Sequence, residues 1–145
     1  ESPRRGFEFV TRKITHSVAR IKMGLQKELE LGNLEAKRDW GHAKDYVAVM
    51  WKMLQLKKPI DFVIGTGKTH SVREFVKLAF DVVKLDYKKY VKVNKLFFRP
   101  TEVDTLISNS LKAQKILNWK PKFTFDQLVR DMVNSDLKFV KDQKY

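Results

Sequence analysis

The sequence has 145 residues, a length that suits one domain with its own hydrophobic core. Its 43% apolar and 32% charged residues are typical of a globular chain, and the absence of cysteine excludes disulfides and thiolate metal sites. The formal net charge of +13 favours an anionic partner such as a phosphate, a nucleotide, a nucleic acid or a membrane surface. No apolar run suits a bilayer span and no signal-peptide pattern is present, so we expect a cytoplasmic protein. Because the chain begins at Glu1 without a methionine, we expect a piece of a longer protein.

A first helix is predicted from Val10 to Gln26, with one apolar stripe formed by Val10, Ile14, Val18, Ile21 and Leu25. Lys13 lies in the first turn, where the helix dipole disfavours a cation. That cost is tolerated if Lys13 meets an anion; a solvated lysine is the alternative. A short strand follows from Leu29 to Leu31, and Gly32-Asn33 then turns the chain. His16 has no second ligand at helical spacing, so no metal site is expected.

The stretch from Lys37 to Val47 concentrates charge before a second amphipathic helix, which is predicted to end near Leu56. The body of this helix is expected to be buried through Tyr46, Val47, Met50, Trp51 and Leu54. Arg38 places a planar cationic fork near the helix start, where free N–H groups and the dipole attract anions. The pattern therefore suggests a phosphate site. A surface ion pair of Arg38 with Asp39 or Asp45 is the alternative.

A buried strand is predicted at Phe62 to Ile64, followed by the loop Gly65-Thr66-Gly67-Lys68-Thr69. The loop is similar to a P-loop, but its glycines are too close together for that motif, and none is predicted. Two capping boxes, Ser71 to Glu74 and Thr124 to Gln127, are expected to begin helices. A short helix from Ser110 to Leu117 separates them. The last helix is expected to bury Phe125, Leu128, Val129, Met132 and Phe139.

The basic and aromatic stretch from Lys84 to Lys95 has two interpretations. Rings beside cations can hold single-stranded nucleic acid, whereas a solvated loop or short edge strand needs no ligand. A second charged group follows, in which Arg99 is placed to bind phosphate and Glu102 to accept ribose hydroxyls. A weak surface pair between these two residues is the alternative.

The residues that carry a family resemblance run through nearly the whole chain. They are Glu1-Ser2-Pro3-Arg4-Arg5-Gly6, Phe9 to Ile14, Leu31 to Leu34, Lys37 to Val47, His70 to Phe75, Arg99-Pro100-Thr101-Glu102-Val103-Asp104 and Leu117-Asn118-Trp119-Lys120-Pro121. In this order they resemble the C-terminal part of the GDP-mannose 4,6-dehydratase family of extended short-chain dehydrogenases/reductases. The resemblance implies an α/β fold, here a helix-rich, α+β-like substrate-binding lobe with a few short strands. Residues 1–145 would form this single domain, and the Rossmann half would be absent.

The resemblance also implies a function. Such enzymes use NADP to convert GDP-mannose to GDP-4-keto-6-deoxymannose, and their catalytic Tyr/Lys pair, Thr and Glu belong to the N-terminal Rossmann half. This chain alone is therefore expected to be inactive, to have no catalytic residue, and to partner that Rossmann domain within a homo-oligomer. Substrate binding is implied for Val10, Lys13, Asn33, Arg38, Arg99 and Glu102, and an NADP contact for Arg5. A basic nucleic-acid-binding module and a purely structural interaction module remain the alternatives.

Overall fold

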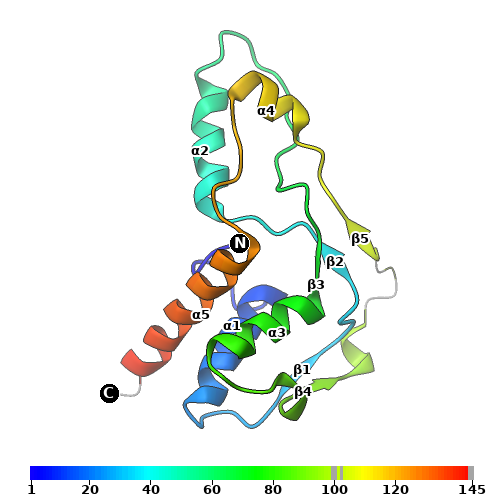
Figure 1. Ribbon diagram of the computed structural model, residues 1–145, viewed down its shortest axis with the longest axis vertical. Helices are drawn as coiled ribbons and strands as arrows, with labels where there is room; N and C mark the ends of the chain where they lie inside the picture. The colour runs from blue at the N-terminus through cyan, green and yellow to red at the C-terminus, as the bar shows by residue number, and fades with distance from the viewer. Residues whose placement is uncertain (99–100, 102, 144–145) are drawn as a thin grey trace.

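The computed structural model describes residues 1–98, 101 and 103–143 (Figure 1). It is rich in helices, with α1 (Val10–Lys22), α2 (Ala43–Leu54), α3 (Val72–Val82), α4 (Leu111–Leu117) and α5 (Phe125–Asp142). Two short 3-10 helices, η1 (Tyr87–Lys89) and η2 (Lys95–Phe97), follow α3. None of the helices in this described part combines the length and the apolarity needed to cross a membrane.

The strands are short and form two small sheets. β1 (Leu29–Leu31) pairs in parallel with β4 (Val91–Val93), with Leu29 opposite Val91. β2 (Lys37–Arg38) lies between β3 (His70–Ser71), to which it is antiparallel, and β5 (Thr105–Leu106), to which it is parallel. The predicted strand at Leu29 to Leu31 is confirmed, and β4 lies within the Lys84 to Lys95 stretch, for which a loop or short edge strand was one interpretation. The two-residue strands β2, β3 and β5 were not predicted.

The main core lies where α1, α3 and α5 pack together beside β1 and β4 (Figure 1). Phe75 and Phe80 on α3 and Met132 on α5 are completely buried there. Both predicted capping boxes are confirmed, because at Ser71 and at Thr124 the side chain and the backbone N–H each bond to the third residue of the helix. These caps fix where α3 and α5 begin and therefore which apolar faces they present.

The first helix ends at Lys22, four residues earlier than predicted. Gly24 has a φ of +72°, a left-handed conformation that glycine adopts without strain and that stops the helix. The N–H of Leu25 then donates to the Arg20 carbonyl at 2.8 Å, which closes the last turn. Leu25 consequently lies outside the helix and is 43% exposed instead of continuing the apolar stripe.

The prediction of a buried body for α2 is wrong. Val49 and Asp45 are the buried residues of this helix, and Val49 packs with Ala113, Leu117 and Trp119 in a second, smaller cluster. The face formed by Val47, Met50, Trp51 and Leu54 is exposed, with Leu54 at 82% and Trp51 at 64%. Helices α2 and α4 stand together at one end of the molecule, away from α1, α3 and α5 (Figure 1). An amphipathic pattern identifies an apolar face but does not reveal whether the same chain covers it.

Two further expectations are wrong. Phe62 to Ile64 do not form a strand, because no described segment pairs with their backbone; Phe62 and Ile64 pack against the smaller cluster while Val63 is 57% exposed. Phe139 is 36% exposed on α5 and contacts Phe7 and His16 at the edge of the core.

Candidate functional site

A pocket of about 320 Å³ opens beside the first turn of α1. Four of the residues predicted to bind substrate lie in its wall, and they come from separate elements. Val10 and Lys13 belong to α1, Asn33 to the turn after β1, and Arg38 to β2. The remaining lining residues are Glu8, Leu31, Gly32, Ala36, Trp40, Val72 and Phe97. The pocket therefore combines an apolar floor with two cations and one carboxylate.

Lys13 and Phe97 contact each other in the wall of the pocket. The Lys13 ammonium lies 4.1 Å from the centroid of the Phe97 ring, within the range of a cation–π interaction. Phe97 reaches this position because η2 passes close to Gly32, where a Cβ atom would overlap the Phe97 carbonyl. Lys13 thus has an aromatic contact and a pocket beside it. The alternative that the sequence allowed, a fully solvated lysine, does not describe this environment.

Arg38 lies in β2, not in the first turn of α2. Its guanidinium donates to the carbonyl of Val103 at 2.6 Å and to that of Lys37 at 2.8 Å. These bonds tie Arg38 to the segment that leads into β5 and hold the guanidinium at the pocket. Arg99 and Glu102, the other two predicted substrate-binding residues, lie outside the described residues.

The start of α2 is already occupied by hydrogen bonds within the chain. The Ala43 N–H donates to the Glu1 carbonyl at 2.7 Å, and the Lys44 N–H donates to Nδ1 of His42 at 3.1 Å. His42 is buried, stacks on Phe123 and contacts Asp131 at 3.0 Å through Nε2. A phosphate at this helix start would have to displace these partners, so the geometry does not support the helix-start phosphate site.

The loop that resembles a P-loop binds a carboxylate from the same chain. Asp39 accepts bonds from the N–H groups of Thr66 and Gly67, both at 2.9 Å, and from the Ser108 hydroxyl at 2.6 Å. Asp45 is likewise used internally, since it accepts the N–H groups of Lys122 and Phe123 at 3.0 Å. Both carboxylates that could have paired with Arg38 therefore hold loops in place.

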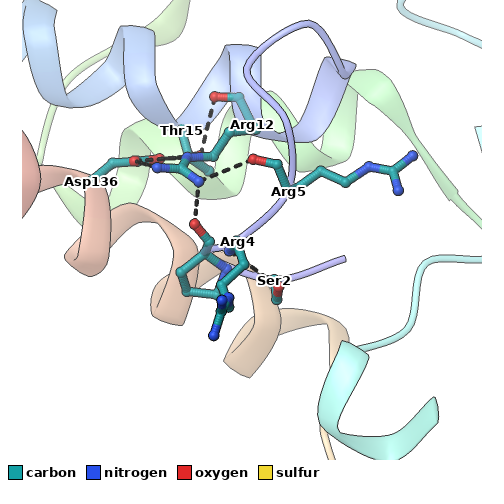
Figure 2. A network of polar contacts seen from close by, with 7 residues as sticks. Ser2, Arg4, Arg5, Arg12, Thr15 and Asp136 are labelled. Carbon is teal, nitrogen blue, oxygen red and sulfur yellow. Dashed lines mark hydrogen bonds and ion pairs between the residues drawn. The ribbon is translucent and has the colours of Figure 1, made fainter. Parts of the chain in front are cut away.

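Arg5 lies on the N-terminal segment and does not line the pocket. Its side chain is 40% exposed, with Nε 3.4 Å from the Glu1 carboxylate and the guanidinium carbon 3.5 Å from the centre of the Phe9 ring. Figure 2 shows this side chain pointing away from a buried network around Arg12. Arg12 donates to Asp136 at 2.8 Å and to the Arg5 carbonyl at 3.1 Å, and it also bonds the Pro3 carbonyl. The network anchors the segment that carries Arg5 to α1 and α5.

The aromatic residues of the basic stretch pack inward. Tyr87 and Tyr90 contact the main core, and Tyr90 stacks on Phe80 with a centroid separation of 5.9 Å. Rings used in this way do not provide a stacking platform for bases. The geometry of this stretch therefore gives no support to the nucleic-acid alternative.

Sequence reasoning missed Glu8, Trp40 and Phe97 as pocket residues. Phe97 had a usable signal, because it lies only two positions before Arg99 in an apolar run. Glu8 had none, since it stands before the helix in a segment without periodicity. Trp40 is 8% exposed, stacks on Phe125 and meets Phe75 edge-on in the core, so its role in the pocket wall follows from packing.

Known proteins with related sequences identify the family. The profile of the family described as GDP-mannose 4,6 dehydratase matches residues 1–132. The chain is 53% identical to GDP-mannose 4,6 dehydratase 1 of Arabidopsis thaliana over 144 residues, which cover 99% of this chain and 40% of that relative. It is 50% identical to the GDP-mannose 4,6 dehydratase of Homo sapiens over 158 residues, covering 97% of this chain and 42% of the relative. The chain thus spans about two fifths of the length of these relatives.

Solved structures show the same fold at low sequence identity. RMD from Pseudomonas aeruginosa, complexed with NADPH, matches with a TM-score of 0.86 and 21% identity, over 95% of this chain and 46% of that one. dTDP-glucose 4,6-dehydratase from Bacillus anthracis, in complex with NAD, matches with a TM-score of 0.79 and 19% identity, over 99% and 43% of the two chains. The predicted fold class, a helix-rich part of an extended short-chain dehydrogenase/reductase, is confirmed. With the family profile matched over residues 1–132 and about half of all positions identical to curated members, this chain belongs to the GDP-mannose 4,6 dehydratase family.

Proposed function

We propose that this chain is the substrate-binding lobe of a GDP-mannose 4,6-dehydratase and that its pocket holds the GDP part of GDP-mannose. The observation that carries this proposal is the convergence of Val10, Lys13, Asn33 and Arg38 on one pocket. A guanidinium fork can bind two phosphate oxygens at once, and an ammonium adds a compact positive charge. Arg99 as a second diphosphate ligand and Glu102 as the ribose ligand complete the proposed site.

The whole enzyme would oxidise the sugar with NADP, eliminate water and return the hydride, giving GDP-4-keto-6-deoxymannose. In this proposal the described residues bind and orient the nucleotide, and the catalytic groups lie in the part of the relatives that this chain does not span. NADP would be held mainly by that other part. Arg5 is the one group of this chain assigned to NADP, and its anchored backbone and half-exposed side chain are compatible with that contact.

The exposed apolar face of α2 supports an intramolecular partner. Val47, Met50, Trp51 and Leu54 form a continuous face of the type that is normally covered in an assembled protein. We propose that the N-terminal Rossmann domain of the same enzyme covers it. Homo-oligomerisation of the whole enzyme and its cytoplasmic location stay predictions.

Nucleotide binding can be tested at Arg38. Because the Arg38→Ala change removes a charge-assisted bond to the diphosphate, the dissociation constant for GDP-mannose should rise at least about tenfold, or ~1.4 kcal/mol. Isothermal titration calorimetry of this chain would measure it. Arg73→Ala is the matched control, since Arg73 pairs with Glu35 on the surface and does not line the pocket. Unchanged affinity in the Arg38 variant, or an equal loss in both variants, would contradict the assignment. Arg99→Ala should weaken binding in the same way in the whole enzyme.

A further inference from the structure

A second hollow lies at the end of the molecule opposite to α2 and α4. The C-terminal ends of α1, α3 and α5 come together there, at the lower left of Figure 1. The groove has a volume of about 640 Å³ and an apolar floor that includes Met23 and Leu137. It shares no residue with the proposed GDP pocket, which lies at the other end of α1.

Four lysines surround this groove: Lys22, Lys84, Lys138 and Lys141. Within residues 1–98, 101 and 103–143, no ion pair or hydrogen bond engages their ammonium groups, and no acidic residue lines the groove. Two surface lysines of the described part form ion pairs elsewhere, Lys77 with Asp81 at 2.7 Å and Lys92 with Glu28. Cations at the C-terminal ends of α1, α3 and α5 offset the helix dipoles, and this effect applies to Lys84 as well, which directly follows the C-cap residue of α3.

Lys84 occupies a strained backbone position. Its φ is +58°, and the N–H of Leu85 donates to the Phe80 carbonyl at 3.1 Å to close the turn. The first helix closes in the same way around Gly24, which tolerates this conformation without strain. A lysine where glycine would be easier to accommodate indicates that the side chain has a use, since strained positions tend to occur at functional sites.

We propose that this groove binds an acidic peptide segment of a partner protein, with carboxylates on the lysines and an aliphatic side chain on the floor. Charge complementarity favours an acidic occupant. A second copy of this chain, with a net charge of +13, would be repelled. Nucleic acid is disfavoured because no aromatic or arginine residue lines the groove, and a flat membrane surface would not fill a concave site.

Fluorescence anisotropy tests the proposal with a short labelled peptide that contains glutamates and a pair of leucines. Replacing the four groove lysines by glutamine should weaken binding at least about tenfold. The control carries the same four-charge change at Lys57, Lys58, Lys115 and Lys120, which are exposed away from the groove, and should lose less than about twofold. Equal losses of peptide affinity in both variants would show that binding depends only on the total charge of the chain, and would overturn the proposal.

Two further measurements distinguish a specific binding groove from a surface that is only charged. A peptide with serine in place of leucine should bind at least about threefold more weakly, and equal affinity would refute a role for the floor. Lys84→Gly removes one cation and relieves strain, so it should raise the melting temperature while weakening peptide binding. Unchanged peptide affinity in this stabler variant, or no saturable binding of the leucine peptide to the unmodified chain, would also overturn the proposal.

Discussion

Asp39 joins three segments beside the candidate site. Its carboxylate accepts bonds from the Gly65–Gly67 loop and from Ser108, next to the strand that carries Arg38. Burial acts to raise the pKa of Asp39, but the hydrogen bonds from Ser108, Thr66 and Gly67 outweigh burial and hold the pKa below its usual value. The charged form of Asp39 is therefore the form that the fold stabilises.

The Asp39→Asn change should lower the free energy of unfolding by roughly 1–3 kcal/mol at pH 7, because an amide cannot replace a carboxylate that accepts bonds on both oxygens. In the unmodified chain this stabilisation is fully present above the unfolded pKa of about 3.9 and is lost as the pH falls through the lower folded pKa. Urea unfolding at a series of pH values, from about 7 down to about 3, would measure both effects. Asp126→Asn, at an exposed pair with Arg130, is the control. If the two variants are equally stable at neutral pH, the role of Asp39 is refuted.

The buried pair of Arg12 and Asp136 was not predictable from local sequence. Arg12 lies off the apolar stripe of α1, a position that normally indicates solvent, yet its side chain is 8% exposed and that of Asp136 is fully buried. The partners are 124 positions apart, and the Thr15 hydroxyl also donates to Asp136 at 2.6 Å (Figure 2). Sequence periodicity describes the faces of one helix and carries no information on which distant charge will meet it.

Asp136→Ala should destabilise the chain by about 3–5 kcal/mol, because it leaves the Arg12 guanidinium buried without its carboxylate. The double variant Arg12→Met, Asp136→Leu replaces both charges with apolar groups and should lose less. Chemical denaturation of the two variants would compare them. A double variant that is as unstable as Asp136→Ala would show that the loss comes from packing and not from the orphaned charge.

Helix ends show why parts of the fold followed from the sequence. The capping boxes at Ser71 and Thr124 are short motifs whose bonds form within one turn, so they were predictable. The strands β2, β3 and β5 have two residues each, too few to produce an alternating pattern, and their pairing is entirely long-range. Conversely, Phe62 to Ile64 had the composition of a strand but no partner among the described segments.

Lys84→Gly should stabilise the chain by roughly 0.5–1 kcal/mol, because glycine adopts the left-handed conformation of this helix end without strain. Gly24→Ala is the reciprocal test at the end of α1 and should destabilise by a similar amount. Thermal unfolding followed by circular dichroism would measure both. Loss of stability in Lys84→Gly would mean that side-chain contacts of Lys84 outweigh its backbone strain.

Over the whole molecule, the sequence indicated four residues that share one pocket, but not the other residues that line it. Family resemblance indicated Val10, Lys13, Asn33 and Arg38, and the fold brings these residues to one pocket. Residue physics alone had linked Arg38 to the start of α2, where the backbone N–H groups are in fact taken by Glu1 and His42. The distinction between a strand position and a helix start depends on the pairing of β2 with β3 and β5, which local sequence does not reveal.

An amide-shift NMR titration with GDP-mannose, with ADP as control, tests the proposed substrate-binding lobe most directly. We expect saturable shifts confined to the neighbourhoods of Lys13, Asn33, Arg38 and Glu102, and stronger for GDP-mannose than for ADP. Diffuse, equal shifts with both nucleotides would indicate general charge attraction, and a well-folded spectrum without shifts would mean that this chain does not hold the nucleotide. Either of these two results would contradict the account.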